Sequence, residues 1–323
     1  MIIFDGQTAI TGMRVGIDLC LRTLVPSLFP FFVLTPLVTF TLMGMPIKSG
    51  KFLSKFCRIP AGSESLLVVG LLGGYPLGAG NIASELQRGT LSKSDAERMA
   101  IFCNNAGPSF LFGILSTMFP RLYWVWLLWF IQIAASLLTG FLLPGGSSKA
   151  ALCCQQNPVT LSESLRQAVR NIAMVCGWVV IFRVILTFLQ VYVLNFIPNT
   201  LCVMMTGLLE LSNGCITLSR IENEIQRFIF AGILLSLGGV CIWMQTQAVF
   251  PELNLSRYIA GRCLHCLICI CLSLLAVPVL SNNFSFYGFI ILLFAGLGII
   301  ILLHFLRKSK KEVAFYHSMM YNG

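Results

Sequence analysis

The feature that most constrains this chain is a set of membrane-length apolar runs, two of which are interrupted by short polar, glycine-rich stretches. Residues 72–80 read Leu-Gly-Gly-Tyr-Pro-Leu-Gly-Ala-Gly, and residues 207–214 read Gly-Leu-Leu-Glu-Leu-Ser-Asn-Gly. In hydrocarbon, non-helical backbone is tolerated only where protein or a water-filled cavity satisfies its N–H and C=O groups. Interruptions at corresponding places in two halves are typical of transporters whose site lies between the halves.

Composition assigns the chain to the polytopic membrane proteins. Of its 323 residues, 57% are hydrophobic and 11% are charged, whereas about 25% are charged in soluble domains. A helix needs about 20 residues to cross the hydrocarbon core. Apolar runs of about this length occur at 24–45, 122–143, 172–194, 258–280 and 286–306, and two more, 65–84 and 199–218, carry the interruptions and are expected to enter the bilayer and return. We therefore predict an all-α polytopic membrane protein in a lipid bilayer.

Membrane topology explains the net charge of +10 better than nucleic-acid binding does. The basic residues are spread through loops and no soluble domain carries a binding face, so we expect no nucleic-acid partner. Residues 48–58 and 307–311 are both rich in lysine and arginine. By the positive-inside rule we expect both segments, and the C-terminus, on the cytoplasmic side of a bacterial cell membrane.

The order of segments predicts an internal duplication. In each half an amphipathic stretch leads into an apolar run, followed by an interrupted re-entrant segment, a charged stretch and a second interrupted helix. The second interruptions are Asn-Asn-Ala-Gly-Pro at 104–108 and Leu-Gly-Gly-Val at 237–240. We predict a first repeat with its preceding interfacial helix at 1–143, a linker at 144–160, a second repeat at 161–280, and a final transmembrane helix with a basic cytoplasmic tail at 281–323.

Glu210 is the most informative acidic residue because it lies within an apolar run. An ionised side chain there costs several kcal/mol unless it is paired or hydrated. Two interpretations stay open. Glu210 binds a coupling H⁺ or Na⁺ or accepts hydrogen bonds from a solute, or it forms a structural ion pair with Arg183, which we take as the one basic residue deep in a span.

The other candidate site residues lie at the interruptions. Amides orient polar ligands, and broken helices expose partly charged N–H and C=O groups. The alternative is that these small and polar residues only pack helices together, and Tyr75 could likewise stack on a base or anchor a turn. The predicted substrate-binding residues are Gly74, Tyr75, Pro76, Asn104, Asn105, Glu210, Asn213 and Gln245.

We expect neither an enzyme nor a metal or cofactor site. The chain lacks the zinc-protease, serine-hydrolase and phosphate-loop motifs, and Glu210 has no acidic partner in another span. Residues 263–271 hold four cysteines and a histidine. On a helix, however, Cys263, Cys266 and Cys269 share a face only loosely, and no second cluster completes a metal site.

Several of these motifs resemble a known family. Residues 26–32 read Pro-Ser-Leu-Phe-Pro-Phe-Phe, 73–79 read Gly-Gly-Tyr-Pro-Leu-Gly-Ala, and 102–110 read Phe-Cys-Asn-Asn-Ala-Gly-Pro-Ser-Phe. Weaker matches follow at 207–214, at 238–239 and at Gln245. Over roughly residues 12–275, the chain resembles the sporulation integral membrane proteins that carry nucleoside-recognition (Gate) domains.

The resemblance implies two Gate-like repeats with broken or re-entrant helices, related to concentrative nucleoside transporters and to the membrane regions of ferrous-iron permeases. It also implies a role in endospore formation. We therefore expect a transporter-like protein that handles a small polar solute such as a nucleoside. The alternative is a non-transporting membrane scaffold for assembly of the spore envelope. A hydrated polar cavity lined by the site residues favours the transporter, and mutual burial of those residues favours the scaffold.

Overall fold

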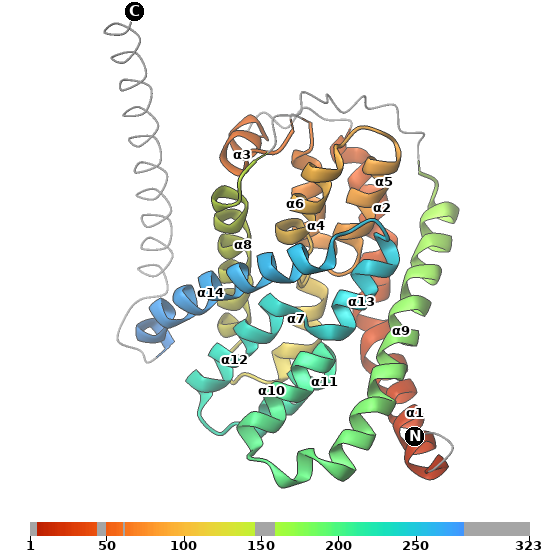
Figure 1. The fold of residues 1–323 in the computed structure, drawn as a ribbon, viewed down its shortest axis with the longest axis vertical. Coiled ribbons are helices and arrows are strands. Elements are labelled where there is room, and N and C mark those ends of the chain that lie inside the picture. Colours follow the sequence, from red (N-terminus) through yellow and green to blue (C-terminus); the bar gives the residue numbers. More distant parts are fainter. Residues whose placement is uncertain (1–4, 44–49, 61, 146–158, 281–323) are drawn as a thin grey trace, which may run out of the picture. The chain divides into compact units, whose positions relative to one another are not determined.

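The computed structural model describes residues 5–43, 50–60, 62–145 and 159–280, and every regular element within them is helical (Figure 1). The chain forms two compact units, Met1–Ser273 and Leu274–Gly323. Six described segments are long and apolar enough to span a membrane: Gly6–Leu37, Lys93–Thr117, Leu122–Leu142, Leu161–Tyr192, Glu224–Val249 and Leu255–Pro278. The predicted all-α polytopic membrane protein is confirmed. The final helix and basic tail predicted at 281–323 lie outside the described residues.

The first half begins with one long helix, formed by α1 (Gly6–Leu19), a π-helical turn (Cys20–Leu24) and α2 (Val25–Met43). The wide turn ends two residues before Pro26, which has no N–H to donate to the preceding helical turn. The sequence predicts an interfacial helix before the first span. In the structure this stretch is continuous with the apolar helix that follows and packs along α9 (Leu161–Tyr192).

The interrupted run of the first half forms a hairpin. After α3 (Gly50–Cys57), the short helices α4 (Glu64–Gly73) and α5 (Leu77–Gln87) pack against each other, and Gly74-Tyr75-Pro76 forms the tip between them. Gly74 has a φ of 77°, which favours glycine because it carries no Cβ. A broken helix follows, made of α6 (Lys93–Cys103) and α7 (Pro108–Ile114), and α8 (Leu122–Leu142) ends this half.

The second half shows the same order of elements. α9 is followed by a hairpin of α10 (Asn199–Leu209) and α11 (Leu211–Thr217), a broken helix of α12 (Glu224–Leu237) and α13 (Gly239–Val249), and α14 (Leu255–Leu280). The hairpin breaks at Glu210 and the broken helix at Gly238, as the interruptions predict.

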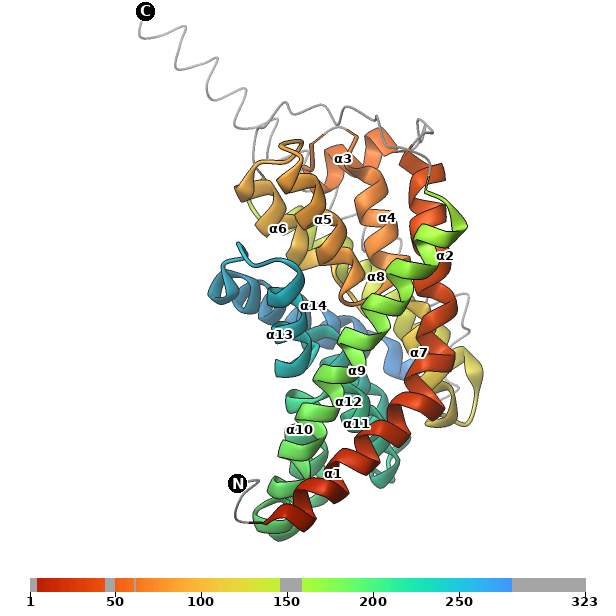
Figure 2. The same ribbon diagram turned by 90° about the vertical axis from the view of Figure 1, so that its right-hand side faces the viewer.

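The two long helices run side by side in opposite directions, as Figure 2 shows. Gly12 faces Thr187, and Gly16 faces Val180 and Arg183. The α4–α5 and α10–α11 hairpins enter the first unit from opposite ends in Figure 1, so the breaks of both halves come together in its interior.

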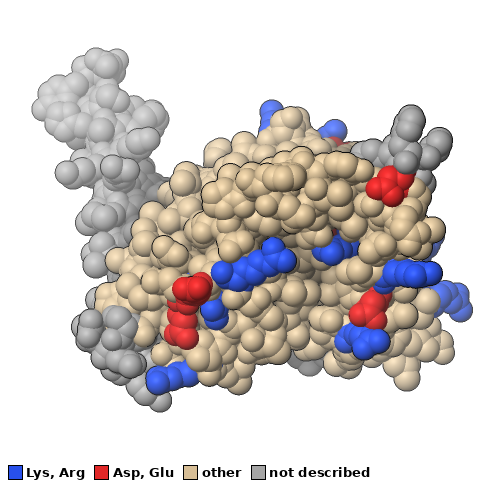
Figure 3. Space-filling model, turned by 90° about the horizontal axis from the view of Figure 1, so that it is seen from below, with Lys and Arg blue, Asp and Glu red and all other residues tan. Residues whose placement is uncertain are grey.

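The outer surface suits contact with lipid. Large apolar side chains are exposed on several helices, among them Ile181, Leu201 and Leu267. Seen from below in Figure 3, charged side chains are scattered over a surface made mostly of other residues.

Glycines let the first hairpin touch the end of α6 backbone to backbone. A Cβ added at Gly70 would lie 1.7 Å from the carbonyl oxygen of Cys103, and one added at Gly78 would lie 2.2 Å from the same atom. Neither separation is possible for real atoms. Hairpin and broken helix therefore reach this distance only because both positions lack a side chain, as is common where membrane helices pack.

We predict that Gly70→Ala destabilises the protein by about 1–3 kcal/mol, the usual cost of forcing extra atoms into a packed interior. The measurement is the thermal unfolding midpoint of the purified protein in detergent. Gly177→Ala is the matched control, because Gly177 is also helical and nothing lies within 4 Å of its added Cβ. Equal midpoints for the two variants would show that the close approach is not required.

Candidate functional site

A fully buried arginine, Arg262 on α14, connects the breaks of the two halves. Its guanidinium donates to five acceptors: the carbonyl oxygens of Ile101 at 3.1 Å, Asn104 at 3.2 Å and Leu235 at 3.4 Å, the amide oxygen of Asn105 at 2.9 Å, and the hydroxyl of Tyr75 at 2.5 Å. Its charged carbon also lies 5.6 Å from the centre of the Tyr75 ring, a favourable cation–π distance.

Two of these acceptors are helix-end carbonyls. Ile101 lies in the last turn of α6 and Leu235 in the last turn of α12. Carbonyls at a helix C-terminus lack a partner within the helix and carry partial negative charge. Among the described residues no carboxylate forms an ion pair with Arg262. We infer that the two helix ends, and not an acid, balance its charge.

The two asparagines of the first broken helix are fully engaged within the protein. The amide nitrogen of Asn104 donates to Thr246 Oγ1 and to the Tyr258 hydroxyl, both at 3.1 Å, and its oxygen accepts from the Ala79 N–H. The amide nitrogen of Asn105 donates to the Phe102 carbonyl and to Ser136 Oγ. Both side chains are buried. In this conformation they act as connections between helices.

Glu210 caps the second hairpin. Its carboxylate accepts from the backbone N–H groups of Ser212 at 2.9 Å and Asn213 at 2.7 Å, and from the Asn213 amide nitrogen at 2.6 Å. Arg183 donates to the amide oxygen of Asn213 at 2.9 Å. The direct Glu210–Arg183 ion pair of the structural interpretation is not formed, since Asn213 lies between the two charges.

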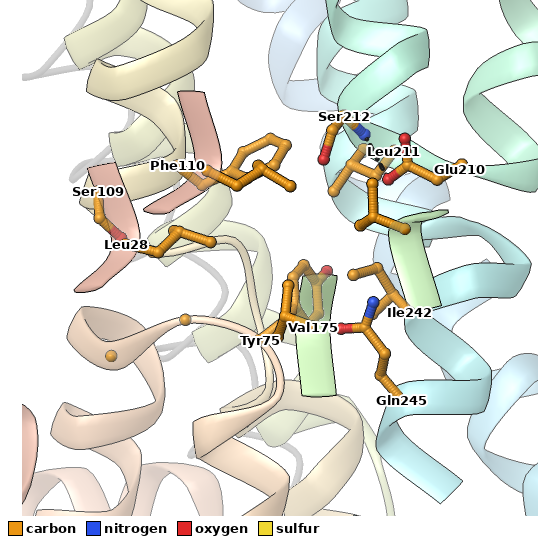
Figure 4. Close-up of a pocket in the computed structure, with 15 residues that line it drawn as sticks. Leu28, Tyr75, Ser109, Phe110, Val175, Glu210, Leu211, Ser212, Ile242 and Gln245 are labelled. Carbon is orange, nitrogen blue, oxygen red and sulfur yellow. Dashed lines mark hydrogen bonds between the residues drawn. The ribbon is translucent and has the colours of Figure 1, made fainter. Parts of the chain in front are cut away.

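A small cavity beside Glu210 is lined by residues of both halves (Figure 4). The first half contributes the hairpin tip with Gly74 and Tyr75, and the second contributes Glu210 and Gln245. Its volume of about 30 Å³, counted as space for the centres of water molecules, holds about two waters, since one needs roughly 10–15 Å³ by this measure.

The cavity offers oxygen atoms that lack partners. Gln245 Oε1 and Ser109 Oγ are both buried and form no hydrogen bond, and both residues line the cavity together with Glu210. In Figure 4 the Gln245 amide points toward Tyr75. In Figure 4 Ser109 lies on the opposite side of the cavity from Glu210 and Gln245. The Glu210 carboxylate and the Gln245 amide oxygen are groups that suit a hydrogen-bond donor or a small hard cation.

The structure thus distributes the predicted site residues over three places. Gly74, Tyr75, Glu210 and Gln245 line the cavity, and Asn213 holds the Glu210 carboxylate. Asn104 and Asn105 lie in the hydrogen-bond network around Arg262. Pro76 lines a separate and larger cleft.

Sequence reasoning missed Arg262 and was wrong to treat Arg183 as the one basic residue deep in a span. Arg262 lies inside the apolar run at 258–280. That position was itself a sufficient signal, because an ionisable residue within a span is expensive and normally has a function or a partner.

The cysteine and histidine side chains of residues 263–271 on α14 do not all face the same side of the helix. Cys266, Cys269 and His265 are buried, whereas Cys263 and Cys271 are exposed. Within the part of the chain that the structure describes, no group of three or more His, Cys, Asp or Glu residues could hold a metal ion.

We predict that Arg262→Met strongly destabilises the protein, because it leaves several buried acceptors unpaired at about 1–3 kcal/mol each. Arg262→Lys should restore only part of the lost stability, since a single ammonium group cannot reproduce the hydrogen bonds of the planar guanidinium. Thermal unfolding in detergent measures both variants. Arg257→Gln, on the same helix, removes only an ion pair with Glu97 in which the arginine side chain is 75% exposed, and should change stability by less than about 1 kcal/mol. An Arg262→Met variant as stable as the Arg257→Gln control would contradict the assignment.

Comparison with known proteins gives one relative. The chain is 22% identical to the sporulation integral membrane protein YlbJ of Bacillus subtilis strain 168, over 301 aligned residues that cover 79% of this chain and 73% of the relative. No family model matches the chain. No solved structure matches it either.

Proposed function

We propose that this chain, a relative of the YlbJ-type sporulation integral membrane proteins, transports a small polar solute such as a nucleoside during endospore formation. The observation that carries the proposal is the cavity where the breaks of both halves meet, with the Glu210 carboxylate and the unpartnered Gln245 oxygen in its wall.

The arrangement of the helices supports this proposal. The order of long helix, hairpin, broken helix and helix occurs twice, and the two long helices are antiparallel. Inverted repeats of this kind place substrate and coupling-ion sites at the repeat interface, next to discontinuous helices. We infer that the two halves are Gate-like repeats of inverted topology.

The size of the cavity favours a coupling ion over an organic solute. Pockets for organic ligands usually measure several hundred Å³, whereas this cavity holds about two waters. Na⁺ or a hydrated proton fits beside Glu210, and a nucleoside does not. In the proposed cycle the ion binds here, and the solute binds where the hairpin tips move apart.

We predict that Na⁺ stabilises the parent protein and that this stabilisation depends on Glu210. The thermal midpoint is measured in detergent with Na⁺ against choline at constant ionic strength. A ligand at a hundred times its dissociation constant adds about 2.7 kcal/mol. Glu210→Gln should abolish the response, and Gln245→Met, which leaves the α11 cap intact, should weaken it.

Glu222→Gln is the control for loss of a carboxylate, because Glu222 is exposed. It should respond like the parent protein. If Na⁺ does not move the midpoint in a Glu210-dependent way, the ion site is refuted.

A second function, the non-transporting scaffold, is favoured by one observation. Asn104 and Asn105 are buried with their amide nitrogens bonded inside the protein, which is the mutual burial expected of breaks that serve packing. Uptake measurements in vesicles separate the two functions, since a scaffold moves no solute whatever ion gradient is applied.

A further inference from the structure

A second hollow, much larger than the cavity, lies on the other side of the first hairpin tip. This cleft has a volume of about 360 Å³, counted as space for the centres of water molecules. Its walls come from both halves, namely α2 and α5 of the first and α9 and α13 of the second. Figure 2 shows α2, α5 and α9 together at the upper end of the first unit.

One face of α5 lines the cleft along its whole length. The lining residues of this helix are Leu77, Gly80, Asn81, Ser84 and Glu85, and Arg88 follows directly after it. Their three- and four-residue spacing is that of a single helix face. Eleven residues rise about 16 Å, roughly half of the hydrocarbon thickness of about 30 Å. The cleft thus leads from the outer end of α5 to the buried tip at Pro76.

The hairpin tip separates the cleft from the ion cavity. Gly73, Gly74 and Tyr75 line the cavity, whereas the next residues, Pro76 and Leu77, line the cleft. A shift of this one turn would join the two spaces, so the tip is the barrier between them.

The polar lining of the cleft has an excess of positive charge. Glu85 is buried and pairs with Arg88 at 2.6 Å. Arg170, on the opposite wall formed by α9, forms no ion pair or hydrogen bond with any described residue. Gln167 and Asn171 lie beside it, and Asn81 lies on α5. A guanidinium with no partner among the described residues, placed among amides, matches a solute that carries a carboxylate or phosphate together with hydroxyl or amide groups.

We propose that this cleft is a water-filled half-channel through which a small organic anion reaches the hairpin tip from the cytoplasmic side, with Arg170 as its anchor. This inference rests on the proposed transport function. The side follows from α3, which lies at the same end of the first unit as α5 in Figure 1. The basic segment at 48–58, which includes α3, is the one that the positive-inside rule assigns to the cytoplasm.

Thiol labelling of the full chain in membrane vesicles tests the half-channel. Asn81→Cys and Asn171→Cys should gain labelling over the parent chain with a charged, membrane-impermeant maleimide, when the reagent is applied from the cytoplasmic side. Ala173→Cys is the depth-matched control, since Ala173 is exposed on the same helix but does not line the cleft. Labelling of the cleft variants no faster than the control, or from the opposite side, overturns the proposal.

Protection from labelling tests the chemistry of the solute. Uridine 5′-monophosphate should slow labelling of Asn81→Cys at least about threefold, and uridine should not. Adding Arg170→Gln should remove the protection. Adding Arg166→Gln, one turn earlier and paired with Glu163, should leave it intact. Equal protection by uridine, or none by the monophosphate, overturns the anion assignment.

A lipid phosphate is the other source of an anion. Labelling is therefore compared in vesicles with and without phosphatidylglycerol. Protection by that lipid alone would overturn the proposal that the anion bound in the cleft is a water-soluble solute. None of these outcomes depends on Glu210, so failure of the half-channel and failure of the ion site are separate results.

Discussion

The structure depends on how the ends of broken helices are satisfied inside the membrane. Helix-end carbonyls in hydrocarbon cannot turn to water, and each unsatisfied group costs several kcal/mol. Arg262 lowers this cost for both α6 and α12, because its guanidinium donates hydrogen bonds to the carbonyl oxygens of Ile101 and Leu235, one at the end of each helix. The same group fixes the hairpin tip through Tyr75. A single buried cation therefore sets the position of three breaks.

Glu210 plays the opposite electrostatic role at the remaining break. It lies at the N-terminal end of α11, where the free N–H groups carry partial positive charge, and accepts from two of them. Arg262 and Glu210 thus each lie at helix ends of opposite sign. Glycines complete the arrangement, because Gly70 and Gly78 allow the first hairpin to reach the α6 end that Arg262 holds.

The breaks were predictable from sequence and their partners were not. Glycine, proline and an isolated acid are local signals, so the breaks at Gly74, Glu210 and Gly238 were located correctly. The partners of Asn104 are 142 and 154 residues away, and no local pattern encodes such contacts. The amphipathic stretch before the first span is a related case: its pattern shows that one face is apolar, and it cannot show that α9 packs against that helix.

The two charged centres differ in how completely their surroundings are satisfied, and this difference separates the fixed from the adaptable part of the molecule. Around Arg262 the side chains of Tyr75, Asn104 and Asn105 all have partners, so any movement there breaks hydrogen bonds in a low-dielectric interior. Around Glu210, the cavity and the free oxygen of Gln245 leave hydrogen-bonding capacity unused. A bound ion would restore that capacity. We infer that a change in occupancy beside Glu210 acts first on the second hairpin, whereas the network around Arg262 resists movement of the first hairpin tip. Packing and transport therefore make different demands on different residues.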